Sequence, residues 1–158
     1  MSPRSKPKVS SAYRRILWPT DFSLLAEAAL PHAIKLAAEN SAELVVLHVL
    51  FPVVLYPIPE VVGAAWDQLE RVGKAELHRI TKKLQGQVPK LRVHSVLAQG
   101  VPFDQILRAA KRLRCDLIVL ATHGRTGLRH ALMGSVAENV VRRAFCPVLT
   151  VRPPRFPR

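Results

Sequence analysis

Hydrophobic residues along the chain alternate between short, largely apolar runs and longer stretches in which they recur every three or four positions. The runs span residues 16–18, 44–50, 93–97, 116–121 and 148–151. No polar residue interrupts Leu117-Ile118-Val119-Leu120, which is typical of a strand buried on both faces of a parallel sheet. The runs therefore predict five parallel strands.

The stretches between these runs have the period of amphipathic helices. In the first, Ser23 is expected to cap the helix, and Pro31 to kink it or delay its regular part. The apolar positions are Leu30, Ala33, Ile34 and Ala37 in the first stretch, Leu69, Gly73, Leu77, Ile80 and Leu84 in the second, and Phe103, Ile106, Leu107 and Ala110 in the third, which follows Gly100 and Pro102.

The fourth stretch predicts the best-delimited helix. Ser135 and Glu138 have the spacing of a capping box, and Pro147 ends the pattern. The apolar face of this helix consists of Val136, Val140 and Ala144. Strands and helices thus alternate from the first run to the last. The pattern predicts an α/β fold, an open parallel sheet with helices on both faces.

Composition and charge divide the chain into a domain and two basic arms. With 158 residues, 49% of them hydrophobic, the chain has the size and core of one domain. Eight of its 24 basic residues precede the first apolar run or follow the last one, so the body between them, residues 16–151, carries 16 basic against 11 acidic residues. We expect residues 1–13 and 153–158 to be extended or disordered around a domain at 14–152. Basic arms attract polyanions, but the low charge of the body argues against a shaped nucleic-acid site.

The first ten residues and the two cysteines indicate the cellular compartment in which the protein is expected. Residues 1–10 contain no apolar run, so they are neither a secretory signal nor a membrane span, and we expect a cytoplasmic protein. Cys115 and Cys146 do not have the spacing of metal ligands. In a reducing compartment such a pair is expected to consist of ordinary core thiols.

A proline-rich segment interrupts the alternation. Within residues 50–60, the stretch 51–59 is apolar but contains three prolines, so the segment predicts a loop rather than a central strand or regular helix. We call this segment the flap, and two interpretations of it remain open: it folds onto the core of its own domain, or it covers a ligand or contacts a partner subunit.

Candidate chemistry follows the first and fourth runs, because ligands bind beyond the carboxyl ends of the strands in an open parallel sheet. The first run is followed by Thr20-Asp21-Phe22-Ser23, and the fourth by a glycine-containing loop that reaches Gly134-Ser135. Backbone N–H groups at a helix start, with a serine hydroxyl, favour a phosphate. Arg125 and Arg129 add positive charge to that loop. The loop has neither the P-loop pattern nor the dinucleotide fingerprint.

Several polar residues allow a second interpretation. Asp21 could act as a general base, but a lone carboxylate beside Ser23 is more typical of a ligand acceptor or turn former. His123 and His130 could hold a metal, although loop histidines usually face solvent. His48, at a strand end, is expected to be a hydrogen-bonded core residue. Ser135 lacks a recognisable base, so we interpret it as a cap and phosphate donor rather than a nucleophile.

These blocks together resemble the universal stress protein family. Ala121-Thr122-His123-Gly124, nine further residues and Gly134-Ser135 resemble its nucleotide-binding signature, Gly-x-x-Gly, nine residues, Gly-Ser/Thr. The resemblance covers residues 14–152 and includes the blocks 16–23, 47–49, Gly100-x-Pro102 and 146–152.

The resemblance implies a five-stranded parallel sheet of order 3-2-1-4-5 and a homodimer in which the final strands pair. It also implies ATP or a related adenine nucleotide, AMP or ADP, often with Mg²⁺ or Mn²⁺. The protein would then be a stress-linked sensor or regulator with unidentified protein partners. No residue set for activating water is evident, so we expect at most slow ATP hydrolysis.

Site residues carried over by position fall into three groups. Pro19, Thr20, Asp21 and Val49 would line the adenine and ribose; Ala121, Gly124, Arg125 and Thr126 would follow the ribose and first phosphate; and Gly134, Ser135 and Val136 would hold the phosphates. Ala121 replaces the first signature glycine. Its methyl group is costly only if that residue needs positive φ or touches the ligand at its α-carbon. Two alternatives therefore remain open, a nucleotide-free dimeric adaptor and a weak polyanion binder acting through the basic arms.

Overall fold

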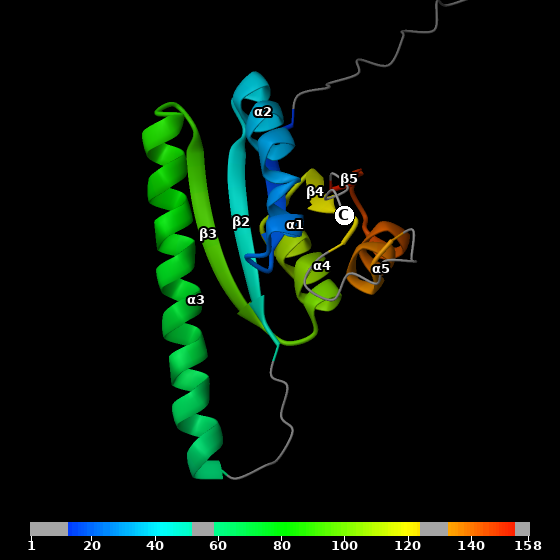
Figure 1. Ribbon diagram of the computed structural model, residues 1–158. Helices are drawn as coiled ribbons and strands as arrows, with labels where there is room; N and C mark the ends of the chain where they lie inside the picture. The colour runs from blue at the N-terminus through cyan, green and yellow to red at the C-terminus, as the bar shows by residue number, and fades with distance from the viewer. Residues whose placement is uncertain (1–12, 52–58, 124–132, 154–158) are drawn as a thin grey trace, which may run out of the picture.

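The computed structural model describes residues 13–51, 59–123 and 133–153, and its elements follow the predicted alternation (Figure 1). The strands are β1 (Arg15–Thr20), β2 (Glu43–Leu50), β3 (Arg92–Gln99), β4 (Leu117–Ala121) and β5 (Val148–Val151). The helices are α1 (Leu24–Glu27), α2 (Leu30–Asn40), α3 (Pro59–Gln87), α4 (Pro102–Arg112) and α5 (Ser135–Arg143). Each predicted run forms a strand.

The strands form one parallel sheet of order β3-β2-β1-β4-β5. Arg15 pairs in register with Glu43, which pairs with Arg92, so β1, β2 and β3 begin at one level. The chain order reverses beside β1, which lies between β2 and β4. This arrangement confirms the predicted fold and places a topological switch point at the ends of β1 and β4.

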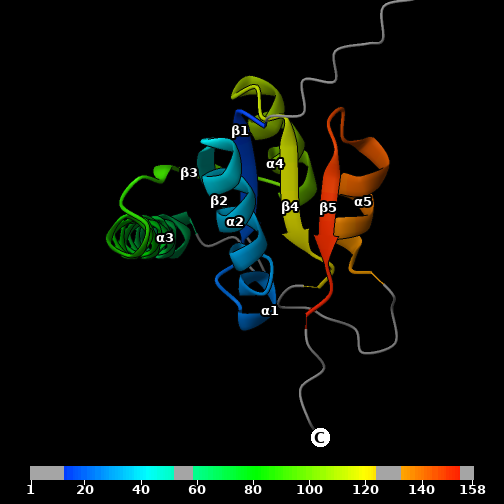
Figure 2. The same cartoon turned by 90° about the horizontal axis from the view of Figure 1, so that it is seen from above.

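Helices cover both faces of the sheet (Figure 2). Successive strand residues point to opposite faces, so Ile16 and Trp18 pack with α2 and α3 while Leu17 packs with α4 and α5. Both faces of β1 are therefore buried. This two-sided burial explains why the strand runs contain so few polar residues.

The start of the first crossover follows the sequence prediction. The Ser23 side chain caps α1 by accepting the Ala26 N–H at 3.1 Å. Pro31 lies in the first turn of α2, where its missing N–H is not needed. The regular helix is thus delayed until Leu30, as expected.

Three local predictions were wrong. The N-cap of α5 is Gly134, and the Glu138 carboxylate instead pairs with Arg142 at 3.5 Å; Ser135 and Glu138 therefore form no capping box. Leu69 is 49% exposed rather than part of the buried stripe of α3. The ends of the loop predicted for residues 50–60 belong to other elements, since β2 ends at Leu50 and α3 begins at Pro59. Residues 52–58, the centre of the predicted flap, lie outside the described part.

Candidate functional site

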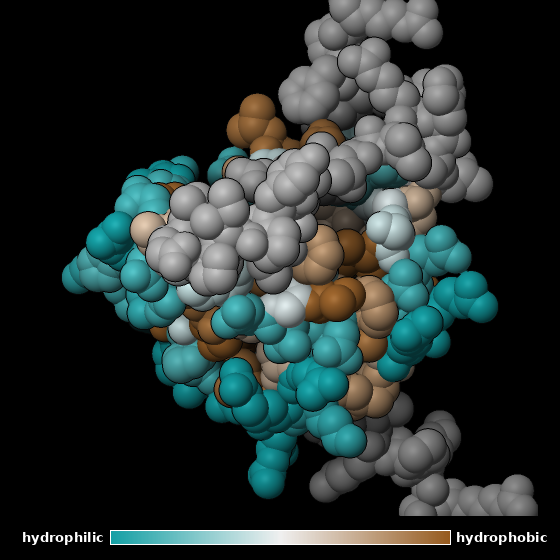
Figure 3. Space-filling model, turned by 90° about the horizontal axis from the view of Figure 1, so that it is seen from below, coloured by the Kyte–Doolittle hydropathy of each residue, from teal (hydrophilic) through white to brown (hydrophobic). Residues whose placement is uncertain are grey.

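The candidate site lies at the carboxyl edge of the sheet, where β1, β2 and β4 end at Thr20, Leu50 and Ala121. Figure 3 views the molecule from the side at which β2 and β3 end. Hydrophobic residues reach the surface near the middle of this face and are bordered by hydrophilic residues.

The turn after β1 is held by its own side chains. The Thr20 hydroxyl accepts the Phe22 N–H at 3.0 Å, and an Asp21 carboxylate oxygen accepts both the N–H of Ser23, at 3.0 Å, and its hydroxyl. Phe22 has a φ of 63°, a strained value for a bulky residue. Of the interpretations open for Asp21, the geometry therefore supports that of a turn former.

A histidine on β2 supports this turn from the side. The His48 Nδ1 lies 2.8 Å from the Thr20 carbonyl oxygen, and its ring stacks on Phe22 with centroids 4.0 Å apart. A carbonyl only accepts, so Nδ1 carries the proton. His48 is thus the hydrogen-bonded residue that the sequence predicted. Its neighbour Val49 is half-buried and packs with the α4–α5 core.

The other half of the site joins the end of β4 to the start of α5. The Gly134 N–H donates to the Thr122 carbonyl oxygen at 2.7 Å, and the Thr122 N–H donates to the Val151 carbonyl at 2.8 Å. A Cβ on Gly134 would lie 3.2 Å from that Thr122 oxygen. The close approach of two backbones therefore explains the glycine.

The start of α5 has the features of an anion site. Its N-cap is a glycine and makes no side-chain capping bond, and Ser135 is exposed in the first turn. The first N–H groups of a helix have no intrahelical partner, and the helix dipole adds partial positive charge there. This end of α5 can accordingly bind a phosphate oxygen.

The structure brings together most of the site residues predicted from sequence, at the ends of adjacent strands. Those it describes are Pro19, Thr20, Asp21, Val49, Ala121, Gly134, Ser135 and Val136. Gly124, Arg125 and Thr126 lie outside the described residues, as do Arg129 and His130. Sequence reasoning missed the Phe22–His48 stack, because nothing in the local pattern links residues of two different strand ends.

Titratable groups give little support for a metal centre. Within the described ranges, no group of three His, Cys, Asp or Glu side chains could hold a metal ion. Cys115 and Cys146 are free, as predicted. Burial raises the pKa of the Cys115 thiol from 9.0 to about 12 and also raises the pKa of Cys146. Both stay protonated near neutral pH and are poor metal ligands.

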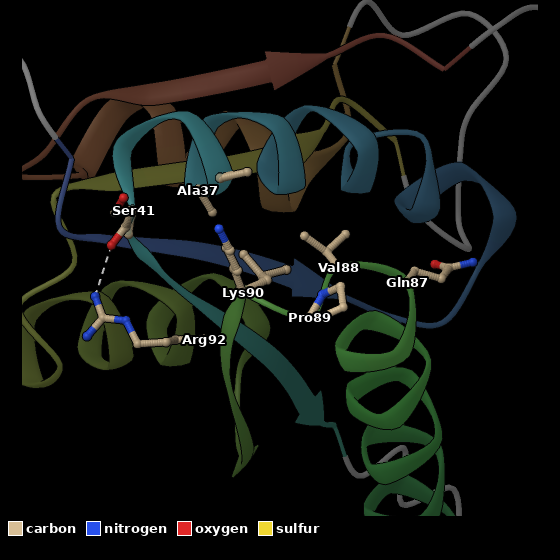
Figure 4. Close-up of a pocket in the computed structure, with 10 residues that line it drawn as sticks. Ala37, Ser41, Gln87, Val88, Pro89, Lys90 and Arg92 are labelled. Carbon is tan, nitrogen blue, oxygen red and sulfur yellow. Dashed lines mark hydrogen bonds between the residues drawn. The ribbon is translucent and has the colours of Figure 1, made fainter.

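A cavity of about 690 Å³ lies at the opposite, amino edge of the sheet (Figure 4). It is a partly open pocket between the end of α2, the end of α3 and the start of β3, and its lining residues include Ser41, Lys90 and Arg92. The Arg92 guanidinium donates to the Ser41 carbonyl at 3.0 Å. Nothing in the hydrophobic pattern predicts this cavity. In the part of the chain that the structure describes, no helix has the length and apolarity needed to span a membrane.

Comparison with known proteins gives consistent matches over nearly the whole chain. The profile of the universal stress protein family matches residues 12–152. Universal stress protein MJ0531 of Methanocaldococcus jannaschii is 34% identical over 145 residues, which cover 90% of this chain and 84% of that protein.

Solved structures agree with this comparison. The structure of MJ0577, another universal stress protein of M. jannaschii, has a TM-score of 0.81 and 31% identity, covering 91% of this chain and 99% of that one. A universal stress protein in complex with cAMP has a TM-score of 0.65 and 25% identity, covering 89% of this chain and 98% of that one.

Proposed function

The chain belongs to the universal stress protein family, and on that premise we propose that it binds an adenine nucleotide at the carboxyl edge of its sheet. The ligand is ATP or its products AMP and ADP. The protein then acts as a stress-response sensor or regulator in the cytoplasm, and hydrolysis is at most slow. The complex of a 25% identical relative with cAMP supports an adenine ligand.

The observation that carries this proposal is the start of α5. Gly134 is held against the Thr122 carbonyl, and no side chain caps the first turn. Ser135 and Val136, the next two residues, have N–H groups that would meet the phosphates. The Ser135 hydroxyl would add a further donor.

The adenine and ribose would lie toward the first two strands. Pro19, Thr20, Asp21 and Val49 would line them, with the Asp21 turn kept in place by the Phe22–His48 stack. Ala121, together with Gly124, Arg125 and Thr126, would follow the ribose and first phosphate. Mg²⁺ or Mn²⁺ would be held chiefly by phosphate oxygens, since the described side chains offer no cluster of three metal ligands.

Ala121 is compatible with this site. It ends β4 and is not among the described non-glycine residues with positive φ. The position therefore does not need the conformational freedom of glycine. Its backbone N–H is retained, and only a ligand atom in contact with the α-carbon would meet the added methyl group.

Nucleotide content and calorimetry test the proposal. Protein purified without added nucleotide is denatured, and any released adenine nucleotide is identified; stripped protein is then titrated with ATP and Mg²⁺. We expect saturable binding of one nucleotide per chain, with GTP binding more weakly. Absence of both copurified nucleotide and saturable binding would refute the proposal and favour the nucleotide-free adaptor.

We also propose a homodimer formed through β5. This strand has four residues, pairs with β4 on one side and meets no other strand of the described residues. Leu149 in β5 is 37% exposed, and Phe145 just before it is 57% exposed. An edge strand flanked by exposed apolar side chains is suited to pairing with a second copy.

A charge placed on this strand should separate the dimer. We expect Leu149→Arg to shift sedimentation velocity from dimer to monomer at micromolar concentration. The matched control is Leu69→Arg, which puts the same charge at an exposed leucine of α3. A Leu149→Arg protein that stays dimeric while the control dissociates would move the interface to α3.

A further inference from the structure

Charge in this fold is sorted between the two edges of the sheet. The α4 helix has Asp104 in its first turn and Lys111 and Arg112 in its last. Likewise, α5 has Glu138 in its first turn and two arginines in its last. This order suits the helix dipole. Every crossover helix of a parallel sheet runs from the carboxyl edge back to the amino edge, so the basic ends of α4 and α5 lie at the amino edge, whereas α2 and α3 have no basic residue in their last turns.

Residues at the strand starts add to this charge. Together they form what we call the basic edge, defined as Arg14, Lys90, Arg92, Lys111, Arg112 and Arg114. All six side chains are exposed, and none has an ion pair with an acidic residue of the described part.

The acidic residues at this level already have partners. Glu39, in the last turn of α2, is exposed and pairs with Lys35 at 3.9 Å. Glu43 pairs with Arg15 at 2.6 Å. Asp116 accepts the backbone N–H groups of Arg14 and Arg15 at 2.8 and 3.1 Å. Glu39 and Glu43 are therefore matched by cations outside the basic edge, whereas Asp116 keeps its negative charge because backbone N–H groups are neutral. The six basic side chains thus outnumber this one carboxylate, and the edge stays strongly positive.

The side chains of the basic edge are spread over a long surface and do not converge on a single position. Its members stand just before or at the starts of β3, β1 and β4 and at the end of α4. From β3 to β4 is three strand spacings, or roughly 14 Å. The cavity described above opens in it, with Lys90 and Arg92 reaching from the start of β3 toward the end of α2 (Figure 4). The chain also enters the domain here, because the Tyr13 N–H donates to the Asn40 side chain at 3.2 Å.

We propose that the basic edge is a contact surface for the phosphate backbone of a nucleic acid. The span of the basic edge suits an extended polyanion better than one small anion. Four of its six members are arginines, and the planar guanidinium group can donate two hydrogen bonds to one phosphate. A membrane surface fits less well, since Phe145 is the one strongly exposed aromatic near this edge among the described residues. The charge of +5 for residues 16–151 did not predict this surface, because that sum leaves out Arg14 and because no sum shows where charges lie.

Two matched triple variants test the proposal. The edge variant carries K90Q, K111Q and R112Q, and the control carries R71Q, K74Q and R108Q, which are exposed and bonded to neighbours on their own helices. Both lower the net charge by the same amount. Binding of a labelled single-stranded oligoribonucleotide is measured between 50 and 200 mM salt by fluorescence anisotropy, with the fold of each variant checked by thermal denaturation.

We expect the edge variant to reduce the slope of log K against log salt by about 2 and to bind about tenfold more weakly, since each lost phosphate contact lowers the slope by about 0.7. The control should stay within about twofold of the unmodified protein. Saturating ATP should leave binding unchanged, because the nucleotide site lies at the other edge.

Other outcomes overturn the proposal. Equal losses in both variants would mean attraction by net charge alone, and displacement by ATP would locate the oligonucleotide at the carboxyl edge. Failure of the unmodified protein to bind at 50 mM salt would dismiss a nucleic-acid surface. If vesicles with anionic lipid bind with the same dependence on the edge variant while the oligonucleotide does not, the partner is a membrane.

Discussion

A Gly134→Trp variant is expected to bind ATP at least about 100-fold more weakly, a loss of about 3 kcal/mol. A Cβ at this position would lie 3.2 Å from the Thr122 carbonyl oxygen, so the indole cannot turn toward β4. It is forced outward across the first turn of α5, where the phosphates would lie. The Gly134 φ of −72° is open to any residue, so the backbone conformation itself is not strained. Calorimetry on stripped protein measures the effect.

The controls separate lost binding from lost structure. Gly134→Ala adds only the Cβ and should weaken binding less than the tryptophan variant. Circular dichroism and the thermal midpoint should show that both variants fold. A folded Gly134→Trp protein with unchanged affinity would remove the start of α5 from the nucleotide site.

Trp18→Ala is expected to lower the free energy of unfolding by about 4 kcal/mol. Trp18 is fully buried in β1, packs with α2 and α3, and donates its Nε1–H to the Ala26 carbonyl at 3.4 Å. Alanine would leave a large cavity in the centre of the sheet. Urea unfolding followed by far-ultraviolet circular dichroism gives the value.

The second tryptophan supplies a matched control. Trp66 is only half-buried on α3, so Trp66→Ala makes the same chemical change with less buried surface lost. We expect it to cost less than half as much. Equal losses at the two positions would mean that β1 does not dominate the core.

The central strands β1, β2 and β4 could be predicted because they are buried on both faces. Burial on two sides removes polar residues from Leu117 to Leu120, and that signal is local to the segment. The order of the strands is not local, and only the resemblance to a family implied it. The same limit explains why the N-cap of α5 was predicted wrongly. The contact of Gly134 with the Thr122 carbonyl joins residues from two elements, and the local sequence Gly-Ser is compatible with either residue as the N-cap.

The number of charged residues could be counted from the sequence, but their positions on the surface could not be predicted from it. The sequence gives 24 basic and 11 acidic residues, whereas their distribution depends on the direction in which each helix runs. Asp116 illustrates the difference. Its carboxylate holds the start of β1 from a position 102 residues after Arg14, and a sum counts it simply as one negative charge.

The position of β1 also sets the order in which the protein can be completed during synthesis. This strand is made first yet becomes the centre of the sheet, and its neighbour β4 leaves the ribosome only about a hundred residues later. Until then a nascent chain can assemble β1, β2 and β3 with one edge of β1 unpaired. Such an edge is a template for pairing with other chains. The half-made protein is thus more exposed to aggregation than the finished one, and arrival of β4 closes that interval.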